Sequence, residues 1–119
     1  MYSRQVLDHF QNPRNAGEIA LPDAHAEIEN PACGDILRLT LKITENRIIE
    51  ARFKAKGCVA AIACGSALTQ LIYGKSTAEA QQTRREEISS ALGGLPQAST
   101  HAAQLAIDTL TAALKNSRP

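Results

Sequence analysis

A strict alternation of apolar and polar residues runs through residues 36–43 and resumes over residues 48–55, and it constrains the fold more than any other feature. Such a period of two, with charged side chains at the other positions, is typical of antiparallel strands that have one buried and one solvent-exposed face. A turn at Glu45-Asn46 separates the two stretches, so the sequence predicts a β-hairpin. The residues expected to face the core are Leu37, Leu39, Leu41, Ile43, Ile49, Ala51, Phe53 and Ala55.

Helices are expected on both sides of this hairpin. Residues 58–73 are nearly all small or aliphatic, which indicates a central, buried helix that ends at Gly74. Before the hairpin, Ser3 is the expected N-cap of a short helix that runs to residue 10. The apolar face of this helix would consist of Val6, Leu7 and Phe10.

The last third of the chain carries helix-start signals. Two pairs match a capping box, Ser76 with Glu79 and Thr83 with Glu86, and they predict two short helices. After a break at residues 93–96, a final amphipathic helix begins at Ser99-Thr100-His101, with an apolar face of Leu105, Ala106, Leu110, Ala113 and Leu114. Residues 24–30 alternate weakly and are expected to form an edge strand. We therefore predict one α+β domain over residues 1–119, a small antiparallel three-stranded sheet with helices packed on one face.

Composition excludes several classes of partner. Thirteen basic and twelve acidic side chains leave no charge bias that would favour nucleic acid. No apolar run has the length of a membrane span, and the N-terminus lacks a signal-peptide core, so we expect a cytoplasmic protein without a membrane partner. In that reducing compartment the three cysteines are expected to be ligands, nucleophiles or core residues and not disulfides.

Candidate metal ligands stand at the ends of the expected elements. Cys33 and Asp35 precede the first strong strand, Cys58 opens the apolar helix, and His101 lies in the first turn of the last helix. Thiolate, imidazole and carboxylate donors together suit iron, iron–sulfur clusters or zinc. Cys64 lies six residues after Cys58, about 600° further around the helix, and is expected to pack in the core.

Each candidate also has an ordinary structural interpretation. Cys33 is either a metal ligand or an ordinary loop cysteine. Asp35 is either a weak ligand or proton acceptor, or an ordinary turn aspartate. A helix N-terminus favours a thiolate at Cys58, and the alternative is a small apolar residue packed at the helix start. His101 is a ligand or an exposed first-turn histidine.

Taken in order, these residues resemble the NifU/IscU family of iron–sulfur cluster assembly scaffolds over nearly the whole chain. The resemblance rests on several ordered motifs: residues 2–10 with Asn12-Pro13-Arg14-Asn15, the loop Pro31 to Asp35, the segment Ile48 to Cys58 with Ala61-Ile62-Ala63, Gly74-Lys75-Ser76, and Leu95-Pro96. In this family three cysteines and an aspartate form the assembly site, and a histidine directly precedes the third cysteine.

By matching motif, the resemblance implies a metal site of Cys33, Asp35, Cys58 and His101, whereas Ala102 stands where the third cysteine would be. It also implies a SufE/NifU-like fold and a scaffold or carrier, not an enzyme, that binds iron, sulfide or a [2Fe–2S] cluster and passes it to apo iron–sulfur acceptor proteins. Zinc could occupy the site in purified protein. A homodimer that shares one cluster would supply the missing ligand.

The resemblance also bears on partners and on the branch of the family. A cysteine desulfurase is the expected sulfur donor, which leaves two alternatives: a persulfide acceptor that uses Cys33 or Cys58, or a degenerate regulatory paralogue. Leu95 to Ser99 lacks the second proline and the lysine of the Leu-Pro-Pro-Val-Lys segment, which puts recognition by Hsp70-type chaperones in doubt. The zinc-dependent SufU branch is not favoured because its insertion between Cys58 and His101 is lacking, and no second Cys-x-x-Cys domain is expected.

Overall fold

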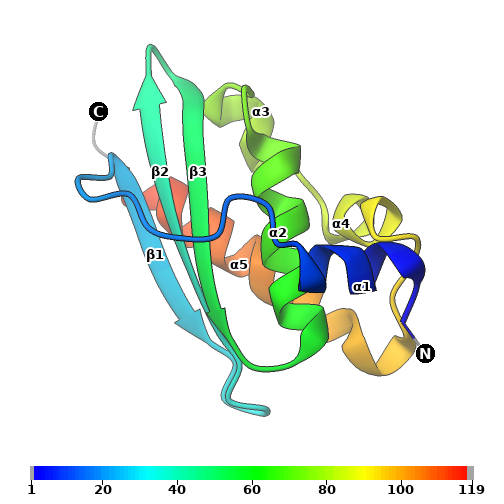
Figure 1. The fold of residues 1–119 in the computed structure, drawn as a ribbon. Helices are drawn as coiled ribbons and strands as arrows, with labels where there is room; N and C mark the ends of the chain where they lie inside the picture. The colour runs from blue at the N-terminus through cyan, green and yellow to red at the C-terminus, as the bar shows by residue number, and fades with distance from the viewer. Residues whose placement is uncertain (1, 118–119) are drawn as a thin grey trace.

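The computed structural model describes residues 2–117, in which a three-stranded sheet carries helices on one side (Figure 1). The elements in chain order are α1 (Arg4–Gln11), β1 (Ala24–Glu29), β2 (Ile36–Thr44), β3 (Arg47–Lys56), α2 (Val59–Ile72), α3 (Thr77–Gln81), α4 (Arg85–Ala91), the 3-10 turn η1 (Gln97–Ser99) and α5 (Thr100–Lys115). The predicted α+β class, with its three-stranded antiparallel sheet, is confirmed.

The sheet is antiparallel in the order β1-β2-β3, so β2 lies between two edge strands. Leu39 at its centre pairs with Ala26 of β1 and with Phe53 of β3, which brings the apolar positions of the three strands onto one face. The turn residues Glu45 and Asn46 have φ angles of 52° and 63°. Positive φ at both positions is the mark of a type I′ turn, whose twist matches that of a hairpin. The predicted hairpin and its turn are confirmed.

The predicted alternation is wrong at the start of β3. Lys42 pairs with Glu50, whereas the next residue, Ile43, pairs with Ile48, so a β-bulge leaves Ile49 as the extra residue. Ile48 is fully buried, and Ile49 is 47% exposed. Because both residues are isoleucine, the sequence pattern does not show which of them is skipped.

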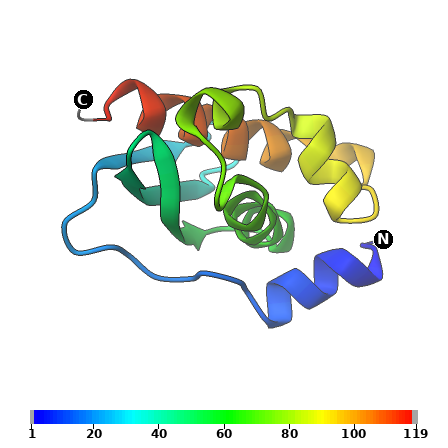
Figure 2. The same ribbon diagram turned by 90° about the horizontal axis from the view of Figure 1, so that it is seen from above.

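The hydrophobic core lies between the sheet and two long helices. α2 packs against β3, and α5 packs against β1 and β2, so together they cover one face of the sheet (Figure 2). α2 approaches β3 closely at Gly65, where a Cβ atom would lie 2.6 Å from a ring carbon of Phe53. Burial of each large aliphatic side chain contributes about 1.5–3 kcal/mol to folding. The fully buried aliphatic residues include Leu37, Leu39, Leu41, Ile48, Leu68, Ile72 and Leu110.

Residues 12–23, which we call the strap, pair briefly with the edge of β3 and then cross the opposite face of the sheet (Figures 1 and 2). The backbone N–H of Ile19 donates to Thr40 Oγ1 at 3.1 Å, and the N–H of Phe53 donates to the carbonyl of Asn15 at 3.0 Å. Thr40 is buried as a result. The expectation that this whole face is exposed to solvent is therefore wrong where the strap covers it.

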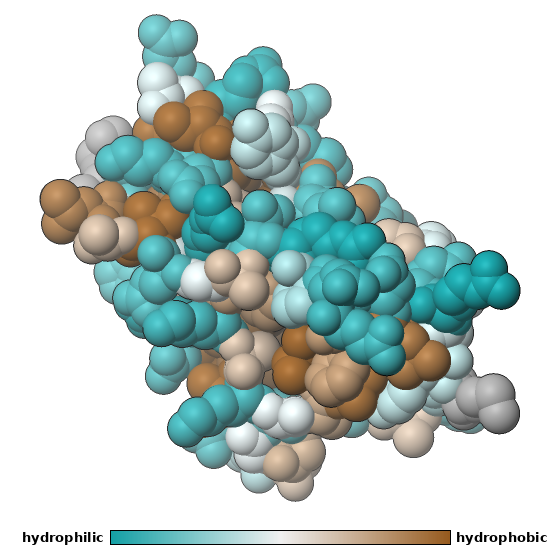
Figure 3. Space-filling model, viewed as in Figure 1, coloured by the Kyte–Doolittle hydropathy of each residue, from teal (hydrophilic) through white to brown (hydrophobic). Residues whose placement is uncertain are grey.

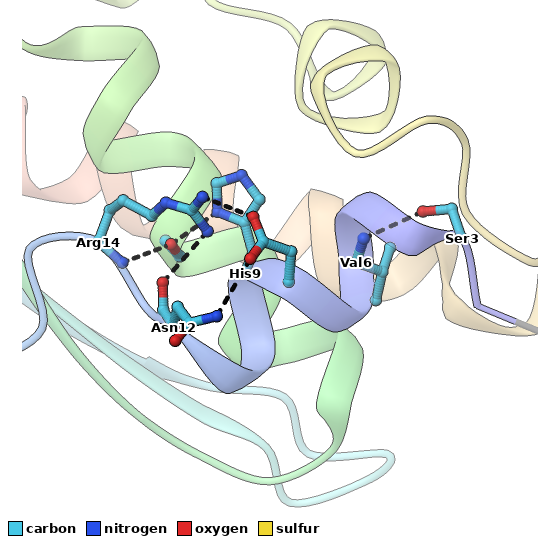
Figure 4. Close-up of polar contacts among 7 residues, drawn as sticks. Ser3, Val6, His9, Asn12 and Arg14 are labelled. Carbon is cyan, nitrogen blue, oxygen red and sulfur yellow. Dashed lines mark hydrogen bonds and ion pairs between the residues drawn. The ribbon is translucent and has the colours of Figure 1, made fainter.

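α1 begins as predicted, because the Ser3 hydroxyl accepts a hydrogen bond from the N–H of Val6 at 3.0 Å (Figure 4). Its buried face is different from the prediction. Val6 and His9 are buried, whereas Leu7 and Phe10 are 42% and 37% exposed. Apolar side chains are visible where α1 crosses the lower half of α2 (Figure 3).

His9 anchors α1 to α2 through a buried polar contact (Figure 4). Its Nδ1 lies 2.7 Å from the hydroxyl of Ser66, and the same oxygen accepts a hydrogen bond from the N–H of Arg14 at 2.8 Å. The Arg14 side chain in turn forms an ion pair with Asp8. Burial, with a smaller contribution from the Arg14 charge, lowers the pKa of His9.

The start of α4 differs from the prediction. The expected pair, Thr83 with Glu86, does not cap this helix, because Thr83 is buried one residue before the N-cap. Instead the N–H of Arg84 donates to the carboxylate of Glu87 at 3.0 Å. Because Glu86 and Glu87 are adjacent, the sequence did not show which of them would be the third residue of α4.

The predicted starts of the remaining helices are confirmed. Ser76 and Glu79 form a reciprocal capping box before α3, and α5 begins at Thr100. Within residues 2–117, every helix falls short of the length and apolarity needed to span a bilayer.

Candidate metal centre

The predicted ligands come from three elements that meet at one end of the molecule. Cys33 and Asp35 belong to the loop between β1 and β2, Cys58 is the N-cap of α2, and His101 lies in the first turn of α5. The β1–β2 loop and the start of α2 lie together at the lower end of the molecule in Figure 1.

The β1–β2 loop is closed by hydrogen bonds to Asn30. Its carbonyl accepts from the N–H of Gly34 at 2.7 Å, its N–H donates to the carbonyl of Asp35 at 2.8 Å, and its side chain accepts from the N–H of Ala32. Gly34 has a φ of 78°, a conformation that side chains with a Cβ rarely adopt. This closed loop exposes the Cys33 thiol and turns Asp35 inward.

Asp35 is the centre of the site, and only 5% of it is exposed. Its Oδ1 accepts a hydrogen bond from the N–H of Cys58 at 3.2 Å, and its Oδ2 accepts from the Cys58 thiol, also at 3.2 Å. Oδ2 also lies 3.8 Å from Nε2 of His101, within ion-pair distance when the imidazole is protonated. The carboxylate therefore connects two of the other predicted ligands.

Cys33 completes the group. One ligand atom from each of Cys33, Asp35 and His101 lies within 4.8 Å of the other two. The His101 side chain is 40% exposed, yet its Nε2 atom is closed to solvent and has no hydrogen-bond partner among residues 2–117. Such an unpaired buried nitrogen costs free energy unless another group satisfies it. The structure thus brings Cys33, Asp35 and His101 into one group of possible ligand atoms, and it joins Cys58 to this group through Asp35.

The Cys58 thiol is less acidic than its place at a helix N-terminus suggested. Its Sγ accepts a hydrogen bond from the N–H of Ala61 at 3.4 Å, which favours the thiolate. Burial nevertheless raises the pKa of Cys58, and the adjacent carboxylate of Asp35 raises it further. Without a cation in the site, Cys58 is therefore a thiol that donates to Asp35, and a bound metal would have to displace its proton.

Two nearby positions contribute no exposed ligand. Cys64 is fully buried within α2, where burial raises its pKa to about 12, so the prediction that it packs in the core is confirmed. Ala102 follows His101 but is 1% exposed and belongs to the hydrophobic core.

One feature of the site was missed in the sequence. Asp35 also accepts the backbone N–H of Cys58 and so caps the start of α2 from another part of the chain. Sequence signals for helix caps lie within a few residues of the helix start. Asp35 and Cys58 are 23 residues apart, so no local pattern could have indicated this contact.

The donor set suits a transition metal. Two sulfurs, one imidazole nitrogen and one carboxylate oxygen are ligands that zinc and iron sites use. Ligand atoms of Cys33, Asp35 and His101 lie close enough together to hold a metal ion, and Cys58 adjoins them through its hydrogen bond to Asp35.

Comparison with known proteins gives the same family as the motifs. Residues 1–118 match the family described as NifU-like N terminal domain. The iron–sulfur cluster assembly scaffold protein IscU 1 of Archaeoglobus fulgidus is 44% identical over 114 residues, which cover 96% of this chain and 74% of that protein. The scaffold IscU of Escherichia coli K12 is 41% identical over 117 residues, which cover 95% of this chain and 91% of that protein.

A solved structure supports the fold. A candidate cluster assembly scaffold of the SUF system from Fervidobacterium islandicum AW-1 superposes with a TM-score of 0.78 at 22% identity, over 95% of this chain and 96% of that one. The match over residues 1–118, together with relatives above 40% identity, shows that this chain belongs to the family of NifU-like N-terminal domains.

Proposed function

We propose that this protein is a scaffold that binds iron and sulfide, or a [2Fe–2S] cluster, and passes it to apo iron–sulfur proteins. The observation that carries the proposal is the convergence of Cys33, Cys58 and His101 around the buried carboxylate of Asp35. Relatives that match nearly the whole chain are named as scaffolds of this kind.

Each side chain has a distinct role in this proposal. Cys33 and Cys58 bind as thiolates, and His101 supplies a nitrogen ligand through its Nε2 atom, which has no hydrogen-bond partner within the described residues 2–117. Asp35 acts as a weak ligand, or as the acceptor of the proton that Cys58 releases, and so keeps the cargo transferable. Imidazole is an accepted substitute for thiolate in cluster proteins. Because the cargo is bound and released, the protein is not an enzyme.

A scaffold of this kind needs a sulfur donor and a recipient for its cluster. A cysteine desulfurase would deliver the sulfur, and apo proteins with free cluster ligands would receive the product. Two copies of the chain could share one cluster, because each contributes two thiolates. We expect these steps to occur in the cytoplasm, and zinc, with the same four donors, could replace iron in purified protein.

A second function is favoured by one observation. The Cys33 thiol is exposed at the tip of the closed loop, where a donor protein can reach it, whereas Cys58 is half-buried. A persulfide acceptor needs one accessible nucleophilic thiol and no full set of ligands. In that case a desulfurase would add sulfur mass to Cys33 without any cluster being formed.

Anaerobic reconstitution with iron, sulfide and reductant tests the scaffold. The parent protein should acquire the visible absorbance of a [2Fe–2S] cluster, and Cys33→Ser, Cys58→Ser and His101→Ala should each lose most of it. Cys64→Ala is the matched control, because it removes a thiol of the same helix that lies in the core. Its stability should fall by about 1 kcal/mol while cluster loading is unchanged.

A parent protein that is folded and reduced but stays colourless after reconstitution would contradict the scaffold function. Mass spectrometry after incubation with a cysteine desulfurase and cysteine then distinguishes the alternatives. Added sulfur on Cys33 would favour the persulfide acceptor, and no added sulfur would favour a regulatory paralogue that holds no cargo.

A further inference from the structure

We propose that Gly57 is a positioning residue: because it has no Cβ, it leaves the space in which the carboxylate of Asp35 is held within reach of Cys33, Cys58 and His101. This inference rests on the metal site of the proposed function, but the geometry on which it depends belongs to the protein without metal.

The space beside Gly57 is filled by Asp35. A Cβ atom built on Gly57 would lie 2.1 Å from Oδ1 of Asp35, 2.6 Å from its Cγ and 3.0 Å from its Cβ. Non-bonded atoms do not approach so closely, and the contact involves the short side chain of a residue fixed by its own loop. Any side chain at position 57 therefore has to move the carboxylate.

The carboxylate cannot move without breaking contacts of the site. Its Oδ1 accepts from the N–H of Cys58, and its Oδ2 lies against the Cys58 thiol and His101 Nε2. Gly57 directly precedes Cys58, so the same backbone turn that presents the ligand thiol also makes room for the carboxylate. Position 57 thus determines whether an oxygen donor stands beside the two sulfurs.

Backbone strain has to be separated from this steric effect. Gly57 has a φ of 138°, so an alanine there is strained even in open space. Gly17, in the strap, has nearly the same φ of 133° and no atom within 4 Å of the corresponding Cβ position. Gly17→Ala is therefore a matched control that carries the strain without the collision.

A double-mutant cycle, measured by thermal unfolding in the absence of metal, tests whether a side chain at position 57 collides with Asp35. Gly57→Ala should lower Tm by at least about 5 °C more than Gly17→Ala, because it adds overpacking to the strain. In an Asp35→Ala background the two closest of the three contacts are gone, so the additional loss at position 57 should largely disappear. The loss caused by Gly17→Ala should be the same in both backgrounds.

Cobalt(II) titration, followed by its visible bands, tests the consequence for the site. Gly57→Ala should bind Co²⁺ about 10–100-fold more weakly than the parent, the usual effect of losing a group that orients a ligand. Asp35→Ala should lose a similar factor, and the double variant should lose no more than either single variant. Gly17→Ala should bind like the parent.

Two results would overturn the proposal: an equal loss of Tm from Gly57→Ala with and without Asp35, or Co²⁺ binding by a folded Gly57→Ala protein that matches the parent. If Gly57→Ala does not fold, recovery of the fold in the Gly57→Ala, Asp35→Ala double variant supports the proposal, and continued unfolding overturns it. A parent protein that binds no Co²⁺ would contradict the proposed metal site, and the double-mutant cycle on Tm would still decide the role of Gly57.

Discussion

At the scale of single residues, Ala102 is the position where this chain departs from the ligand pattern that its family resemblance implies. It follows His101 in the first turn of α5, where backbone N–H groups favour a negative charge. The Ala102 side chain is closed to solvent and belongs to the core. A thiol at this position would therefore be a sheltered ligand, in contrast to the exposed thiol of Cys33.

We predict that Ala102→Cys slows the loss of a reconstituted cluster, because it adds a third thiolate beside His101. The measurement is visible absorbance against time in the presence of an iron chelator. Ala103→Cys is the control, since position 103 is as buried as position 102 but lies about 100° further around α5. Equal rates of loss in the parent and in folded Ala102→Cys would mean that position 102 does not face the site.

At the scale of elements, the attachment of α1 to α2 depends on a neutral histidine. His9 is buried against Ser66, and this burial lowers its pKa below the usual value of 6.5. Below that pH the unfolded chain takes up the proton more readily than the folded one. The contribution of His9 to stability is therefore complete above about pH 6.5 and is lost as the pH falls through its lowered folded pKa.

We predict that His9→Gln flattens the pH dependence of stability on the acid side of neutrality. The free energy of unfolding, from urea titrations between about pH 5 and pH 8, should fall more steeply with acidification in the parent than in the variant. His25→Gln is the control, because His25 is an exposed residue of edge strand β1, whereas the His9 contact joins α1 and α2. Parallel curves for the parent and His9→Gln would contradict the prediction.

The contact between α2 and β3 gives a second prediction for an element. Alanine is a better helix former than glycine by about 1 kcal/mol, so propensity alone favours Gly65→Ala. The new methyl group would lie 2.6 Å from the Phe53 ring, and overpacking of this kind costs about 1–3 kcal/mol. We expect net destabilisation in urea titrations, relieved when Phe53→Leu is added. A more stable Gly65→Ala protein would show that α2 can shift away from the sheet.

The elements were predictable where their signals are local. The alternation in β2 and β3, the turn at Glu45-Asn46 and the apolar run of α2 identified the sheet and its main helix. The bulge at Ile49 could not be predicted, because two adjacent isoleucines fit either register. The strap has no periodic pattern, so its position over Thr40 depends on contacts between distant parts of the chain.

At the scale of the whole molecule, the proposed metal centre joins the β1–β2 loop, α2 and α5. The four site residues could be named from the sequence because they match a family motif and stand at element ends. The distances between these side chains could not be predicted, because Asp35 contacts Cys58 and His101 only once the sheet and both helices have packed.

We predict that zinc raises Tm, because a metal ion that binds only the folded chain stabilises it by mass action. At a free concentration of one hundred times Kd the gain is about 2.7 kcal/mol, or roughly 10 °C for a domain of this size. A chelator should reverse the shift, and Cys58→Ser should remove most of it. The same increase in Cys58→Ser as in the parent would mean that zinc binds elsewhere.

The strap also bears on how the sheet avoids edge-to-edge association with other copies of the chain. β3 is an edge strand of ten residues, and an open strand edge is a template on which another chain can add. The strap occupies the middle of this edge through the backbone of Phe53, and residues 74–75 occupy its beginning through the backbone of Ile48. These short pairings within the chain interrupt the open edge of β3. The strap, although it is neither helix nor strand, therefore helps to prevent further strands from adding to the sheet.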